Sequence, residues 1–201
     1  MTFYNLNKEE KNKIADDFMY VYSPICKVFN EFIPEADYIR NSFNDEINDW
    51  DYISIVTKKK YSSGTTAVAT CSFKSYGAPI IVFTDDICIG KNGKRTYGHH
   101  YEVVAYEDGI NIWSIVPYPE RLERPVLPTK IAFLKFPVKA DTEIKLEVTI
   151  ENKMIVVKMC NHILKVSDSN IPEKFHIGIT ACEGENKFYE FSLSNKEKNN
   201  L

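Results

Sequence analysis

Long hydrophobic runs, a leader segment and an excess of positive charge are all missing from this sequence. No apolar run approaches the ~20 residues that span a bilayer, and the N-terminus has no basic segment followed by an apolar stretch. We therefore expect no signal peptide and no membrane partner. The net charge of −3 gives no basis for binding nucleic acid, so we expect no nucleic-acid partner either.

The cysteines are few and show no pairing pattern. Five are present, an odd number, and no two form a Cys-x-x-Cys motif. Cys71, Cys160 and Cys182 lie in apolar, strand-like contexts, where a thiol behaves as a small buried hydrophobe. Such use of cysteine is typical of a reducing compartment, so the sequence predicts a cytoplasmic protein.

Spacings typical of metal ligands are lacking as well. His99 and His100 are adjacent, and neighbouring residues of a strand face opposite ways, so the two rings cannot easily share one ion. His162 and His176 stand at no ligand spacing from this pair. We expect no metal ion and no cofactor.

The first residues carry a helical pattern. Apolar side chains recur at three- and four-residue steps from Ile14 to Phe32, and Asn7 suits an N-cap with Glu10 three residues further on. Helix is therefore predicted over 8–33, with a break near Ser23. The predicted organisation is an N-terminal helical segment (1–34) packed on a β-sandwich (35–194), followed by a polar tail (195–201).

From Tyr52 onward the pattern is β. The chain of 201 residues, 44% of them apolar, is long enough for one domain with a full core. Predicted loops cover 84–97 and 117–129. Strands are predicted at 51–57, 66–74, 79–84, 98–107, 110–116, 131–137, 143–151, 154–160, 163–167, 174–182 and 187–193.

Residues 142–167 predict a meander of three strands. A turn at Asn152-Lys153 pairs Ile150 with Ile155 and places the apolar side chains of both strands on one face. A second turn, at Asn161-His162, keeps the apolar residues of the third strand on that same face. About ten such strands, mostly antiparallel, imply two stacked sheets or a barrel.

Residues 98–116 predict a hairpin, because Asp108-Gly109 is a strong signal for a two-residue type I′ turn. This turn pairs Glu107 with Ile110 and Val104 with Trp113. One face of the hairpin is apolar and belongs to a core. The other face mixes aromatic rings with hydrogen-bonding groups, as a sugar-binding surface does, and it carries His100, Glu102, Tyr106, Asn111 and Trp113.

The chemistry of this polar and aromatic face suggests a role for each residue. Trp113 would stack on a sugar ring, while Glu102, His100 and Asn111 would hydrogen bond to its hydroxyl groups. The alternative is that Trp113 is a packing residue beneath a loop or the N-terminal segment. Further candidates for the rim stand on the same face or at the ends of the hairpin: Tyr106, Tyr97, Tyr118 and Arg121.

Two runs near the C-terminus are distinctive, FHIGITACEG at 175–184 and FYEF at 188–191. Together with the preceding pieces, Tyr97 to Trp113, Leu146 to Ile150 and the 156–166 hairpin, they resemble the concanavalin A-like lectin/glucanase superfamily over roughly residues 50–193. The resemblance implies a mainly β fold, a two-sheet antiparallel jelly-roll sandwich, here with an N-terminal helical segment. It also implies a saccharide ligand on the concave sheet, without deciding between binding and catalysis.

Three functions follow as hypotheses. The first is a lectin-like domain that binds a carbohydrate. The second is a glycoside hydrolase with Glu102 as an acid or base, although the closely spaced strand carboxylates of the glucanases are absent, since Val104 and Tyr106 stand where further carboxylates should be. The third is a protein-interaction module that uses the apolar stripe from Ile14 to Phe32.

Overall fold

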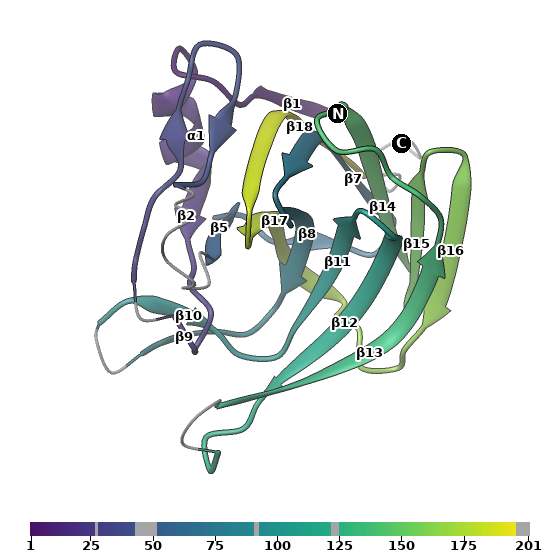
Figure 1. The fold of residues 1–201 in the computed structure, drawn as a ribbon. Helices are drawn as coiled ribbons and strands as arrows, with labels where there is room; N and C mark the ends of the chain where they lie inside the picture. The colour runs from purple at the N-terminus through teal and green to yellow at the C-terminus, as the bar shows by residue number, and fades with distance from the viewer. Residues whose placement is uncertain (27, 43–51, 91–92, 122–124, 196–201) are drawn as a thin grey trace, which may run out of the picture.

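The computed structural model describes residues 1–26, 28–42, 52–90, 93–121 and 125–195, and these residues form two large antiparallel sheets stacked as a sandwich (Figure 1). All the strands predicted from residue 51 onward are present. Asp51 and residues 196–201 of the predicted tail lie outside the described residues. Among the described residues, no helix has the length and hydrophobicity required to cross a membrane.

The first sheet has the strand order β16-β15-β14-β7-β18-β4-β3, with β1 paired to β18 beside this path. Its strands are β1 (Thr2–Asn5), β3 (Ile33–Pro34), β4 (Ile39–Arg40), β7 (Thr65–Lys74), β14 (Ile144–Glu151), β15 (Met154–Met159), β16 (His162–Ser167) and β18 (Glu185–Asn195).

The second sheet has the order β13-β12-β11-β8-β17-β5-β2, with β6 paired to β17. The hairpin of β12 and β13 extends beyond the other strands (Figure 1). The strands of this sheet are β2 (Phe18–Tyr20), β5 (Tyr52–Thr57), β6 (Tyr61–Ser62), β8 (Ala78–Thr84), β11 (His100–Tyr106), β12 (Gly109–Pro117), β13 (Val126–Lys135) and β17 (Lys174–Cys182).

The N-terminal segment is only partly helical, so the helix predicted over 8–33 is wrong beyond residue 17. One helix, α1 (Lys11–Asp17), is present, and the Asn7 side chain accepts a hydrogen bond from the Glu10 N–H at 3.0 Å. The chain then enters β2, where Phe18 packs into the core between the sheets while Met19 packs on the opposite face. Side chains that alternate between two faces are typical of a strand, and the residues of β2 follow this two-residue period instead of the helical spacing.

The segment 84–97, predicted as a loop, contains a small two-stranded sheet of β9 (Ile87–Ile89) and β10 (Arg95–Tyr97). Tyr22 of the N-terminal segment forms a parallel bridge with Thr96. The segment 117–129 is shorter as a loop than predicted, because β13 begins at Val126.

The meander follows the predicted faces. Its first turn is correct, since Ile150 pairs with Ile155, and Asn152 and Lys153 have φ values of +52° and +59°. The second turn lies one residue earlier than predicted, at Cys160 and Asn161, with φ values of +49° and +63°. The register there differs by two residues, which leaves every side chain on its predicted face.

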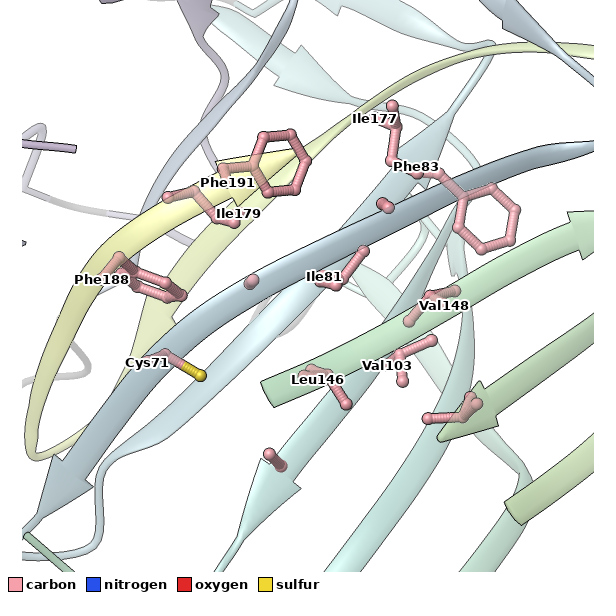
Figure 2. Packing of buried hydrophobic residues seen from close by; sticks show 14 of the residues in the cluster. Cys71, Ile81, Phe83, Val103, Leu146, Val148, Ile177, Ile179, Phe188 and Phe191 are labelled. Atoms are coloured by element: carbon pink, nitrogen blue, oxygen red, sulfur yellow. The ribbon is translucent and has the colours of Figure 1, made fainter. Parts of the chain in front are cut away.

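The main core fills the space between the two sheets. Figure 2 shows Ile81, Val103 and Ile179 of the second sheet facing Leu146 and Phe188 of the first. Cys71 lies in this core and is fully buried, as predicted.

The other two cysteines predicted to be buried are not. Cys160 is exposed and Cys182 is half-buried. The reason for Cys160 is the position of the second meander turn, which places this residue at the tip of a hairpin. The prediction that both thiols act as buried hydrophobes is therefore wrong.

Candidate functional site

The hairpin of β11 and β12 carries the predicted polar and aromatic face. Its register differs by two residues from the prediction, since Tyr106 pairs with Gly109 and Glu102 with Trp113. The turn residues are therefore Glu107 and Asp108, and it is Gly109 that has the positive φ, +127°. A shift of two residues preserves the side-chain alternation, so the predicted face is intact.

Part of this outer face of the second sheet is covered by a second apolar cluster. Val21 from the N-terminal segment and Tyr97 from β10 pack there on the sheet residues Val56, Val82 and Val104. Trp113 packs against the edge of this cluster and is half-buried. The covering segments thus close one part of the face and leave the part around β11 and β12 open.

A groove of about 450 Å³ occupies the open part, a volume within the range of small-ligand sites. The strands contribute its floor, while the turn after β7 and residues near Ser23 contribute its walls. The lining residues are Ser23, Ile25, Tyr52, Phe73, Tyr76, Gly77, Ala78, Ile80, Glu102, Val104, Tyr106, Glu107, Asn111, Trp113, Ile115, Val126, Pro128, Cys182 and Glu183.

Glu102 is held in place by a short hydrogen bond in the floor. The Tyr52 hydroxyl donates to Glu102 Oε1 at 2.6 Å, and Nε2 of His100 lies 3.5 Å from the same oxygen. Burial, followed by the charge of Glu102, raises the pKa of Tyr52 well above its usual value, so this phenol remains a donor. The carboxylate is therefore oriented before any ligand arrives.

Asn111, a lining residue of the groove, carries an unusual acceptor. The residue is 9% exposed, and its side-chain Oδ1 is buried without a hydrogen-bond partner among the described residues. A buried acceptor of this kind costs about 1–3 kcal/mol when it stays unsatisfied. Asn111 pairs with Val104 and with Phe133, so it stands in the middle of the groove-forming strands.

Trp113 already interacts with a cation. Nζ of Lys130, the residue paired with it on β13, lies 4.9 Å from the centroid of the Trp113 ring and 5.9 Å from that of Phe133. Because the Lys130 side chain is exposed, its ammonium can return to water at little cost. The ring of Trp113 thus offers a face that attracts positive charge.

The structure brings four predicted residues into the groove lining, Glu102, Tyr106, Asn111 and Trp113. His100 and Tyr97 lie behind it, each 1% exposed, with their rings stacked at 4.6 Å. The prediction that Tyr97 lines the rim is therefore wrong, because β10 places its ring under the N-terminal segment.

Two predicted rim residues do not reach the groove. Tyr118 and Arg121 are exposed beyond the end of β12 and are not among the lining residues. They lie in the connection between β12 and β13, the hairpin that extends beyond the other strands of the sheet (Figure 1).

Sequence reasoning missed Tyr52 and Tyr76. Tyr52 lies on β5, and only the strand order reveals that its hydroxyl reaches Glu102. Tyr76 is 81% exposed at the turn between β7 and β8, with a φ of +66° that non-glycine residues rarely adopt. A bulky aromatic in a left-handed turn is a signal that a sequence does not display.

The carboxylates of the groove are widely spaced. Glu107 lies beyond the end of β11, five residues from Glu102, which is about 16 Å at the rise of a strand. Glu183 follows Cys182, which pairs with Ala78 on β8. Glu102 pairs with Val82, four residues further along the same strand. Along the backbone, both residues lie farther from Glu102 than the ~5–9.5 Å that separates the paired carboxyl groups of glycosidases.

His99 and His100 are held by hydrogen bonds within the fold. Nε2 of His99 is hydrogen bonded to Ser114 Oγ at 2.9 Å, and Nδ1 of His100 donates to the Gly98 carbonyl. Within the part of the chain that the structure describes, no group of three His, Cys, Asp or Glu side chains is placed to hold a metal ion.

The fold is similar to those of several solved lectin-like structures, although no family model and no curated protein matches the sequence. The carbohydrate-binding module CBM66 from Bacillus subtilis aligns with a TM-score of 0.62 and 11% identity over 89% of this chain and 96% of that one. A legume lectin-like domain from Entamoeba histolytica aligns with a TM-score of 0.59 and 12% identity over 96% of each chain. A protein of unknown function with a galectin-like fold, also from Bacillus subtilis, aligns with a TM-score of 0.61 and 9% identity over 97% of this chain and 95% of that one.

These similarities define the class of fold. The chain has the concanavalin A-like jelly-roll sandwich, which confirms the resemblance seen in its sequence. At 9–12% identity they establish the fold alone. The function has to be argued from the groove.

Proposed function

We propose that this protein binds a saccharide in the groove on the outer face of β11 and β12. The observation that carries the proposal is Asn111, a lining residue of the groove whose buried Oδ1 lacks a partner within the described residues. A hydroxyl group of a bound sugar would satisfy this acceptor and offset its cost.

The neighbouring side chains supply the other contacts that a sugar needs. Trp113 offers an aromatic face for the C–H surface of a pyranose, once the exposed Lys130 ammonium withdraws from it. Glu102, fixed by Tyr52, accepts hydrogen bonds from sugar hydroxyl groups. Tyr106 and the exposed Tyr76 add aromatic surface to the lining of the groove.

The same geometry argues against the glycoside hydrolase alternative with Glu102 as acid or base. Neither Glu107 nor Glu183 stands beside Glu102 on a neighbouring strand, where a second carboxylate for hydrolysis would be expected. We therefore assign Glu102 to ligand binding.

The protein-interaction alternative depends on an available apolar stripe at the N-terminus. Phe18 and Phe32 are instead buried in the core between the sheets, and Val21 and Tyr22 are buried as well. The stripe is used within the chain, which leaves little of it for a partner.

Calorimetry on a panel of oligosaccharides tests the proposal, with a glycan array to choose the panel. Trp113→Ala should weaken the binding of any ligand found by about 1–3 kcal/mol, as loss of a stacked aromatic anchor does. Phe3→Ala is the matched control, since Phe3 is 45% exposed on β1 of the other sheet. Equal affinity of Trp113→Ala and the control would refute binding at this groove.

A further inference from the structure

We infer that the groove selects saccharides that carry a free amino group, and that it discriminates against acidic saccharides. This inference rests on the proposed function and adds the charge of the ligand. It follows from the charges that line the groove, from the unpartnered acceptor of Asn111, and from the cation–π contact that Trp113 makes with Lys130.

The charged groups of the groove have one sign. Three carboxylates, Glu102, Glu107 and Glu183, stand among its described lining residues, and no Lys, Arg or His does. Glu102 is 7% exposed, so its charge is little screened by water, whereas Glu107 and Glu183 are exposed at the rim. An ammonium group entering the groove is attracted by all three, and a sugar carboxylate or sulfate is repelled.

The deepest hydrogen-bonding groups demand donors. Oδ1 of Asn111 has no partner in the part of the chain that the structure describes, and the Tyr52 hydroxyl already donates to Glu102. A ligand therefore has to bring donors to this floor. An ammonium group offers three N–H donors with a positive charge, while an acetylated amine offers one donor and no charge.

Trp113, a lining residue of the groove, already makes a cation–π contact, with Lys130, which is not itself a lining residue. The Lys130 Nζ lies 4.9 Å from the ring centroid, within the range of a cation–π contact. A ligand ammonium would compete with Lys130 for the Trp113 ring and would be repelled by its charge. Removal of Lys130 should therefore favour a cationic ligand.

The test compares two trisaccharides that share a backbone, the β-1,4-linked trimer of glucosamine and its fully N-acetylated form. Calorimetry at about pH 6, where an aliphatic amine is protonated, should give about tenfold tighter binding of the free amine. The preference should shrink as the ionic strength rises from about 0.02 to about 0.5 M, because salt screens the rim charges. A trimer of galacturonic acid should not compete.

Single substitutions locate the effect. Glu107→Gln and Glu183→Gln should each weaken binding of the amine trimer by about twofold to fivefold and leave the acetylated trimer unchanged. Glu143→Gln is the matched control, since Glu143 is exposed just before β14 of the other sheet. This substitution should change the affinity for neither trimer. Lys130→Met should strengthen binding of the amine trimer by a similar factor.

The outcomes separate this inference from the proposed function. If the acetylated or acidic trimer binds as well as the amine trimer, the inference is wrong while saccharide binding stands. If the amine trimer binds Trp113→Ala and the Glu107→Gln/Glu183→Gln double variant as tightly as it binds the parent protein, its binding is adsorption elsewhere and the inference is again wrong. If no saccharide binds the protein, the proposed function itself fails.

Discussion

Gly109 sits where the groove depends on a backbone conformation that only glycine adopts easily. Its φ is +127°, and a Cβ atom built on it would lie 2.1 Å from the Leu134 carbonyl oxygen and 3.0 Å from the Phe136 nitrogen. Both are backbone atoms of the neighbouring β13 segment, so they cannot move without displacing the edge of the sheet. Gly109→Val therefore combines a strained φ with a clash.

The expected cost can be built from these two parts. A side chain held in such a φ region costs about 1–3 kcal/mol, and displacement of β13 adds to it. We expect the free energy of unfolding to fall by about 3 kcal/mol, which is a fall in Tm of about 6–12 °C for a domain of this size. Because Gly109 pairs with Tyr106 and stands two residues from Asn111, saccharide affinity should fall as well.

Gly93→Val is the matched control for this substitution. Gly93 also has a positive φ, +75°, but a Cβ atom there would meet nothing within 4 Å. The difference between the two variants in free energy of unfolding, measured by chemical denaturation, separates the cost of the strained φ from the cost of the clash with Leu134. If Gly109→Val costs no more than Gly93→Val, the packing of β13 against the hairpin turn is not as described.

Two further predictions concern buried groups. Burial raises the pKa of Tyr97, so the folded protein keeps a proton that the unfolded chain loses above about pH 10. Tyr97 alone should therefore lower the stability by about 1.4 kcal/mol per pH unit above that value. Urea denaturation at alkaline pH should show a fall in stability that is shallower by this amount in Tyr97→Phe. A thiol reagent should label the exposed Cys88 and Cys160 in the native protein. Cys71 should react only on unfolding, because it is buried and its burial raises the pKa of its thiol. Modification of native Cys71 as fast as Cys160 would contradict the core described above.

The faces of the strands could be predicted from the sequence, because alternation tolerates errors of two residues. The hairpin turn was expected at Asp108-Gly109 and lies at Glu107-Asp108, yet Glu102 and Trp113 still share a face. The meander behaves in the same way. Pairs such as Ile150 and Ile155 follow from a turn and an apolar pattern that both lie within one short segment.

What could not be predicted depends on contacts between distant segments. The burial of Tyr97 requires the N-terminal segment to lie over β10, and the helical spacing from Ile14 to Phe32 concealed the strand at Phe18–Tyr20. The hydrogen bond from Tyr52 to Glu102 joins residues 50 positions apart. Local propensity carries no information about either arrangement.

Asn111→Leu tests the central claim most directly, because leucine has nearly the shape of asparagine without its polar atoms. If the buried Oδ1 is kept for a ligand, the variant should be as stable as the parent protein or more stable by about 1–2 kcal/mol, since an unsatisfied acceptor is removed. Its affinity for a saccharide should fall at least tenfold in calorimetry. A variant that is strongly destabilised and binds with unchanged affinity would show that Asn111 serves the fold, and it would contradict the assignment of the groove as the binding site.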